Sequence, residues 1–185
     1  MRVTVSPDQI GRAFERVKGS ATFAESAALF AKGHLPLEML QAMTLCPEIL
    51  RVFGETGKGI YPGGAVERSV KEFIILEASR RNRCQFCRDS HIDFVRALGY
   101  SPDPMRELAD SSRRSERERL AIEYTAAAMT DANAIPDGLF ARLKNAFADE
   151  EIVEITFVIG FINLLNLFNN CLQVRYHGEC RVGGS

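Results

Sequence analysis

The sequence predicts an all-α protein. Along nearly every long segment, apolar residues recur with the three-to-four-residue period of an amphipathic helix. No run of alternating apolar and β-branched residues is bounded by hairpin turns, so strands are not expected. Helix-start signals agree: Ser115 and Glu118 have the spacing of a capping box, and Pro7 and Pro136 suit the start of a helix.

These signals divide the chain into helices separated by glycine and proline. The expected helices, in chain order, cover residues 6–18, 23–31, 37–53 with an interruption near Pro47, 67–80, 84–98, 116–129, a short segment from Pro136, and 150–174. Gly19, Gly33 and Gly99 mark helix ends, and a polar loop contains Pro102 and Pro104. The glycine-rich residues 54–59, with residues 62–64 beyond them, are interpreted as a linker between helical units.

The last expected helix has the length of a membrane span and carries no charged residue from Ile155 to Val174. However, several polar side chains, Asn163 and Asn166 among them, would be costly in hydrocarbon. We therefore interpret it as a central buried helix, part of which a subunit interface covers. Asn163, Asn166 and Asn170 form one helical stripe, and we expect their amides to bond neighbouring backbone or each other across an interface.

Composition is that of an ordinary soluble globular protein. The 185 residues are 46% hydrophobic and 25% charged, enough for one domain or two small, closely packed ones. A formal net charge of -1 provides no bulk field for nucleic acid or an anionic membrane, so neither partner is expected. The first residues contain no apolar signal-peptide core, which predicts a cytoplasmic protein.

The five cysteines are too few and too irregularly spaced for a disulfide scaffold in a chain of this size. In a reducing compartment the close pair Cys84 and Cys87 is therefore expected to bind metal or to be a redox centre. Cys46 and Cys171 are interpreted as inert buried core, and Cys180, near His177 in the tail, as having no function. His34, before a Leu-Pro pair, is placed in a loop.

Cys84, Cys87 and His91 share one face of their expected helix. On a helical wheel they fall within an arc of about 60°, which Phe94 and Leu98 continue, so we expect this face to point inward. Residues three apart have Cβ atoms about 5–6 Å from each other, so a small adjustment allows a disulfide. The helix N-terminus and neighbouring arginines, Arg83 and Arg88, favour a thiolate, and either cysteine is a candidate nucleophile.

Glu72 is the expected proton acceptor. It lies in a helical segment that is apolar almost all round, where desolvation is expected to raise its pKa toward the range of a general base. The short connection after residue 80 predicts an antiparallel hairpin, which returns the following helix alongside. His91 is thus the natural partner of Glu72, in a relay from thiol through imidazole to carboxylate.

Zinc binding is the alternative for the same residues, because Cys84, Cys87, His91 and Glu72 are all competent ligands. Structural zinc sites usually draw ligand pairs from separate elements, and the second pair available here is His177 and Cys180 in the tail. We therefore assign no metal and no cofactor. A thioredoxin-type unit is disfavoured, since no strand precedes Cys84.

Glu72 followed by Cys84-Gln85-Phe86-Cys87-Arg88-Asp89-Ser90-His91 resembles the AhpD-like branch of the carboxymuconolactone decarboxylase family. The resemblance extends more loosely over residues 35–174 and implies one compact all-helical AhpD-like domain, predicted at residues 35–175. An N-terminal helical extension, 1–34, and a C-terminal tail, 176–185, flank it. AhpD proteins often carry a histidine between the cysteines, where this chain has Phe86, and this departure leaves the reductant open.

The resemblance also implies hydroperoxide reduction by an antioxidant enzyme of the alkylhydroperoxidase type, assembled as a homotrimer or homohexamer. Glu72 and His91 would form the proton relay. Cys87 would attack the peroxide, and the more accessible Cys84 would resolve the intermediate as a disulfide. A lipoyl domain, a thioredoxin-like protein or a peroxiredoxin is the expected redox partner. The alternatives are a carboxymuconolactone decarboxylase-like enzyme and a zinc-binding or redox-sensing module.

Overall fold

The structure, a computed structural model, describes residues 1–99 and 112–177, and within these residues the regular elements are all helical. The predicted all-α, AhpD-like fold class is therefore confirmed. The expected loop with Pro102 and Pro104, and Cys180, lie outside the described residues. The elements are α1 (Pro7–Arg16), η1 (Ala21–Phe23), α2 (Ala24–Ala31), α3 (Glu38–Thr44), α4 (Pro47–Gly59), α5 (Arg68–Arg81), α6 (Gln85–Ala97), α8 (Glu116–Ala128), α9 (Asp137–Ala146) and α10 (Asp149–Leu172).

The chain forms two compact units. One comprises Met1–Gly63 together with the segment from Asn169 onward, and the other comprises Gly64–Phe168. The unit boundary in the first half thus follows residue 63, whereas the sequence placed a division after residue 34. The domain limits 1–34, 35–175 and 176–185 stay a prediction.

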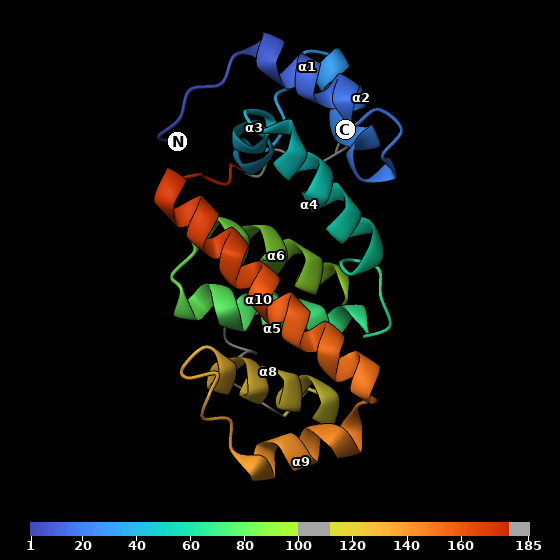
Figure 1. The fold of residues 1–185 in the computed structure, drawn as a ribbon, viewed down its shortest axis with the longest axis vertical. Helices are drawn as coiled ribbons and strands as arrows, with labels where there is room; N and C mark the ends of the chain where they lie inside the picture. The colour runs from blue at the N-terminus through green and yellow to red at the C-terminus, as the bar shows by residue number, and fades with distance from the viewer. Residues whose placement is uncertain (100–111, 178–185) are drawn as a thin grey trace. The chain divides into compact units, whose positions relative to one another are not determined.

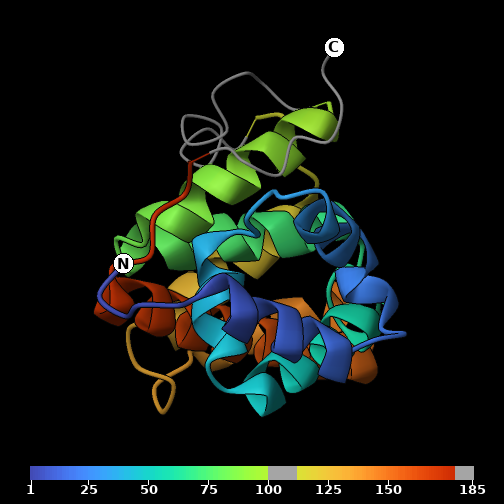
Figure 2. The same cartoon turned by 90° about the horizontal axis from the view of Figure 1, so that it is seen from above.

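The first unit is built on an aromatic and aliphatic core. α1 begins at a capping box in which Ser6 accepts from the backbone N–H of Gln9. It packs beside α3 and α4, as its blue ribbon shows in Figures 1 and 2. Phe14 contacts the rings of Phe23 and Phe30, with centroids 6.5 Å and 5.9 Å away. The short helices of this unit are held by this apolar packing.

The expected glycine-rich linker, which continued beyond residue 59 through Pro62, Gly63 and Gly64, was wrong for residues 54–59, whereas the unit boundary does fall at Gly63. Residues 54–59 form the second half of α4. A Cβ on Gly54 would lie 2.5 Å from Cε2 of Phe23, and one on Gly57 would lie 3.2 Å from Cγ2 of Thr22. The glycines therefore let α4 approach η1 closely, which is a packing role that sequence spacing alone does not distinguish from a flexible connection.

The second unit is organised around α5. Every residue from Val70 to Ser79 is buried, so this helix is covered on all sides. Figure 1 shows α5 between α6 and α8, with α9 beyond α8. Phe73, Leu76 and Val95 form a cluster that joins α5 to α6. Apolar packing between α5 and α6 thus stabilises the predicted antiparallel hairpin.

A buried ion pair anchors the beginning of this unit. Lys71, completely buried, pairs with Glu154 of α10, which also accepts hydrogen bonds from the backbone N–H groups of Ala65 and Val66. Gly64 has φ +97 and leaves no room for a Cβ beside this pair. Burial opposes ionisation of Glu154, but these donors together lower the pKa of its carboxyl below the ordinary value.

α10 is less completely buried than expected. It is long and apolar enough to cross a membrane by length and composition alone, and 39% of its most apolar window is buried. Its inner face includes Ile155 and Ile162. Val153, Phe157, Leu164 and Leu167 are 48–70% exposed, in the heptad-like spacing of a helix seam. The expectation of a central buried helix therefore holds for one face.

Candidate functional site

The turn between α5 and α6 places the first cysteine. Asn82 follows the last residue of α5, Arg83 takes a left-handed conformation with φ +52, and Cys84 is the N-cap of α6 rather than its first helical residue. The N–H of Cys84 donates to the carbonyl of Ser79 at 2.9 Å. This corrects the predicted helix start at residue 84, because the reversal of the chain requires non-helical backbone there.

The two thiols are adjacent and buried. Cys84 and Cys87 approach to near 3.5 Å and are not joined by a disulfide. Their exposed fractions are 1% and 3%. The expectation that Cys84 is the more accessible cysteine is therefore wrong for this chain, since the N-cap position turns inward instead of continuing the helix surface. A small movement suffices to close a disulfide between them.

The structure brings His91 and Glu72 together. Nδ1 of His91 lies 2.7 Å from Oε2 of Glu72, which is completely buried on α5. The other carboxylate oxygen, Oε1, accepts from Nε of Arg68, one turn earlier on the same helix. The cation and the hydrogen bonds favour the ionised carboxylate, whereas its burial favours the neutral acid. A carboxylate that accepts from Nδ1 leaves Nε2 as the basic nitrogen of the imidazole.

Arg68 is a site residue that the sequence analysis missed. Its guanidinium also lies over the ring of Phe94, 5.0 Å from the centroid, and that ring is 5.5 Å from His91. The spacing of Arg68 and Glu72, four residues apart on a helix, was the available signal. Arg68 therefore pairs with Glu72. It also lies over the Phe94 ring, which is next to the imidazole of His91.

The helix face is only partly inward. Val95 is completely buried, but Phe94 and Leu98 are 47% and 43% exposed, contrary to expectation. Arg88 pairs with Asp89 at 2.8 Å, so part of its expected positive potential at the thiols is offset. Both cysteines still lie at the N-terminal end of α6, where the helix dipole favours a thiolate.

An amide network fastens the turn that carries Cys84. Nδ2 of Asn82 donates to Oδ1 of Asn163 at 2.7 Å and to Oδ1 of Asn166 at 3.1 Å. Asn166, completely buried, donates from Nδ2 to Oγ of Ser79 at 3.2 Å. Asn163 and Asn166 of α10 thus bond side chains at the end of α5, where bonds to neighbouring backbone or to each other across an interface were expected. The polar stripe was visible in the sequence, but its partner was not.

The other described cysteines and histidines belong to the unit made of Met1–Gly63 and the segment from Asn169 onward. Cys46 and Cys171 are exposed, so the interpretation of both as buried core was wrong. His34 lies in a loop, as expected, and Nε2 of His177 lies 3.2 Å from Oε1 of Glu38. Among residues 1–99 and 112–177, no group of three or more His, Cys, Asp or Glu side chains has the geometry to hold a metal ion.

A helical hairpin that carries a close pair of thiols beside a buried carboxylate and an imidazole defines a class of helical dithiol protein. The carboxymuconolactone decarboxylase family model matches residues 47–115, which include α5 and α6. The uncharacterized protein YnjA of Escherichia coli is 31% identical over 116 residues, or 61% of this chain. That match spans 64% of the length of YnjA.

Solved structures extend the likeness to the fold. A protein from Agrobacterium tumefaciens, whose name proposes it as an AhpD antioxidant defence protein, is 28% identical with a TM-score of 0.64, over 73% of this chain and 94% of its own. A peroxidase-related protein with an alkylhydroperoxidase AhpD core, from Ralstonia eutropha JMP134, has a TM-score of 0.72 at 19% identity, over 96% and 93% of the two chains. Residues 47–115 thus resemble the carboxymuconolactone decarboxylase family, and the fold of the chain resembles that of AhpD-like proteins.

Proposed function

We propose that the chain is an antioxidant enzyme that reduces hydroperoxides through a cycle of Cys84 and Cys87 between dithiol and disulfide. The observation that carries the proposal is the 2.7 Å contact between His91 and Glu72 beside two adjacent thiols. A thiol needs a base to become a nucleophile, and a partly buried imidazole oriented by a carboxylate is such a base. The names of the AhpD-like relatives support the same activity.

The proton relay runs from a thiol to Nε2 of His91. With Nδ1 turned to Glu72, Nε2 accepts the thiol proton, and the imidazolium is stabilised by the ionised carboxylate. His91 is one helical turn beyond Cys87, which makes Cys87 the better placed donor of that proton. Arg68 pairs with the other oxygen of Glu72, and this cation favours the ionised carboxylate.

The proposed catalytic cycle has three steps, and atoms and electrons balance in each. The Cys87 thiolate attacks the distal oxygen of the peroxide, the O–O bond breaks, and the alcohol leaves with the proton that His91 returns. The resulting sulfenic acid condenses with the Cys84 thiol, which forms the disulfide and releases water. An external dithiol, such as a lipoyl domain or a thioredoxin-like protein, then supplies two electrons and two protons. A peroxiredoxin is the alternative partner.

Assembly as a homotrimer or homohexamer stays part of this proposal. The exposed apolar residues of α10 support a contact between copies, because a row of large exposed side chains is seldom left in water. The substitution Leu164→Glu is then expected to lower the molar mass measured by light scattering. An unchanged molar mass would remove α10 from the interface.

Stopped-flow reaction with an alkyl hydroperoxide tests the mechanism. Cys87→Ser is expected to abolish peroxide consumption, and Cys84→Ser to allow one turnover without a disulfide. Glu72→Gln keeps the size of the side chain but removes the charge that orients His91, so the rate is expected to fall by about 100-fold or more. Cys46→Ser, at the exposed N-cap of α4, is the matched control and should leave the rate unchanged.

Two results would contradict the proposal. If Cys87→Ser and Glu72→Gln react as fast as the wild type, neither residue takes part in the chemistry. If the purified protein holds zinc in equal amount and loses it on Cys84→Ser, the thiols are structural ligands. Slow peroxide reduction combined with fast exchange with a lipoyl or peroxiredoxin partner would instead assign the dithiol to a disulfide reductase.

A further inference from the structure

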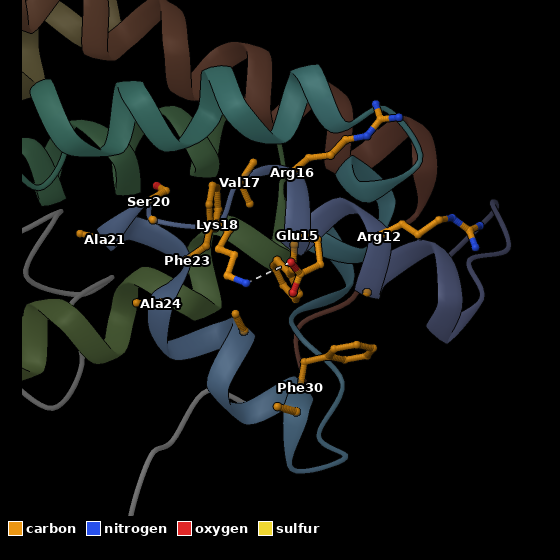
Figure 3. A pocket seen from close by; sticks show the side chains of 15 residues that line it. Arg12, Glu15, Arg16, Val17, Lys18, Ser20, Ala21, Phe23, Ala24 and Phe30 are labelled. Atoms are coloured by element: carbon orange, nitrogen blue, oxygen red, sulfur yellow. Dashed lines mark hydrogen bonds and ion pairs between the residues drawn. The ribbon is translucent and has the colours of Figure 1, made fainter.

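The first unit contains a hollow, and none of its lining residues belongs to α5 or α6. It has a volume of about 900 Å³ and is lined by residues of α1, η1 and α2. Its walls include the rings of Phe14, Phe23 and Phe30. Figure 3 shows the Lys18 side chain reaching toward Glu15, with Phe30 below the pair. This volume is at the upper end of the range for small-molecule sites.

The helix α2 is only partly covered among the described residues, where Phe30 contacts the ring of Phe14. This helix, Ala24–Ala31, is almost entirely apolar in sequence, yet none of its side chains is fully buried. Ala24, Ala27 and Ala31 lie on one face of it and border the hollow. Because alanine side chains are small, they leave space beside α2 that larger side chains such as leucine would fill. The surface is thus shaped for an apolar occupant.

A second hollow adjoins the first and is cationic. Its volume is about 350 Å³. Both hollows are lined by residues 16–21 and Phe23, and the second is also lined by Arg51, Glu55 and Lys58 of α4. Lys18 pairs with Glu15, and Arg51 pairs with Glu48. Within residues 1–99 and 112–177, neither Arg16 nor Lys58 forms an ion pair. On a chain of formal net charge -1, these walls therefore form a local positive site.

We infer that these adjoining hollows bind a single-chain anionic amphiphile, a free long-chain carboxylate being the simplest. The apolar chain lies between α1 and α2, and the carboxylate lies toward Arg16 and Lys58. The ligand and the site are complementary at both ends of the ligand. Aromatic rings and methyl groups suit the hydrocarbon chain, and guanidinium and ammonium groups suit the carboxylate. The inference does not depend on the dithiol chemistry, because none of the lining residues belongs to α5 or α6.

Isothermal titration calorimetry with dodecanoate, below its micelle concentration, tests the site. Affinity is expected to rise about threefold for each methylene added to shorter carboxylates, as for burial of hydrocarbon. Dodecanol, with the same chain and no charge, should bind about tenfold more weakly. Cys87→Ser should bind dodecanoate like the wild type, which separates this site from the proposed peroxidase.

Two kinds of variant locate the ligand. Ala27→Phe fills the space beside α2 and is expected to weaken dodecanoate binding by about tenfold or more, through lost contact with the chain. The double variant Arg16→Glu/Lys58→Glu reverses the charge at the head and should weaken dodecanoate but not dodecanol. Lys32→Glu, an equally exposed charge reversal at the end of α2 outside both hollows, is the matched control and should change affinity less than twofold.

Several outcomes would overturn the inference. Absence of heat with dodecanoate, or equal affinity in all variants that retain wild-type helicity by circular dichroism, excludes the site. A change of molar mass in Ala27→Phe without any dodecanoate binding would assign the hollow to a contact between copies. Sedimentation with phosphatidylglycerol vesicles but no binding of the free carboxylate would assign it to a membrane surface.

Discussion

The two units differ in what they bury. In the unit made of Met1–Gly63 and the residues from Asn169 on, the buried polar side chains among the described residues are Thr44 and Asn169, both uncharged. The unit Gly64–Phe168 buries several charged side chains, namely Lys71, Glu72, Glu77, Arg114 and Glu118. Moving an ion out of water costs several kcal/mol, so each needs partners. The second unit therefore contains a preorganised polar interior, and the first does not.

The cysteines show the same difference at matched positions. Cys46 and Cys84 are both N-caps, of α4 and α6. Each lies at the positive end of a helix dipole, but Cys46 is exposed, whereas Cys84 is buried beside Cys87. A helix N-terminus alone therefore does not distinguish a redox thiol from an ordinary one. The second thiol and the pair of His91 and Glu72 make the difference.

The largest effect on stability is expected from the buried ion pair of the second unit. Lys71→Met leaves Glu154 buried without its cation and is expected to lower the free energy of unfolding by about 3–5 kcal/mol. Arg51→Met breaks the exposed pair with Glu48 in the first unit and should have a much smaller effect, because water and salt screen this pair. Urea denaturation measures both.

The double variant Lys71→Met/Glu154→Leu is the control for this prediction. It removes both charges and should recover much of the loss, since apolar groups replace a buried pair at little cost. If the single and double variants are equally unstable, the defect lies in packing and not in the unpaired carboxylate. The contrast between the two units would then lose its electrostatic basis.

An intermediate effect is expected at the amide network below Cys84. Asn166→Leu keeps the side-chain size but leaves Ser79 and Asn82 short of a buried partner, which should cost about 1–3 kcal/mol. The same variant loosens the turn that bears Cys84, so the equilibrium between dithiol and disulfide should shift toward the dithiol in a glutathione redox titration. Asn163→Ala, which removes one bond from an exposed amide, should have a smaller effect on both measurements. A stability loss with an unmoved redox equilibrium would leave Asn166 a purely structural residue.

The smallest effect is a change with pH. The pKa of Glu154 is lowered in the folded protein, because the bonds from Lys71, Ala65 and Val66 outweigh its burial. Its contribution to stability is therefore complete above the ordinary pKa of a glutamate and is lost as pH falls through the lowered folded value. The difference in unfolding free energy between wild type and Glu154→Gln should shrink on acidification from pH 7 to about pH 3. Glu123→Gln, at an exposed pair with Arg142, should show little change, and an equal slope in both variants would contradict the assignment.

Helix positions were largely predictable because their signals are local. The capping box at Ser115 and the prolines at positions 7 and 136 predicted helix beginnings to within a residue or two. The α4 glycines were misinterpreted, since a glycine that admits the ring of Phe23 has the same sequence signal as one in a linker. The burial of Cys46 was also mispredicted, because exposure depends on which elements pack over a residue.

The sequence by itself determined the all-α class and the hairpin of α5 and α6. It also determined that Glu72, Cys84, Cys87 and His91 lie on this hairpin. Helical period and spacing along one chain are enough to place these side chains on two neighbouring helices. Only the tertiary structure decided that Arg68 shares Glu72 with His91, that Asn166 supports the turn before Cys84, and that hollows open beside α2. The physical reason is that these contacts depend on how helices pack and on the burial and side-chain geometry that packing produces. The hydrophobic period of a single helix does not predict that packing.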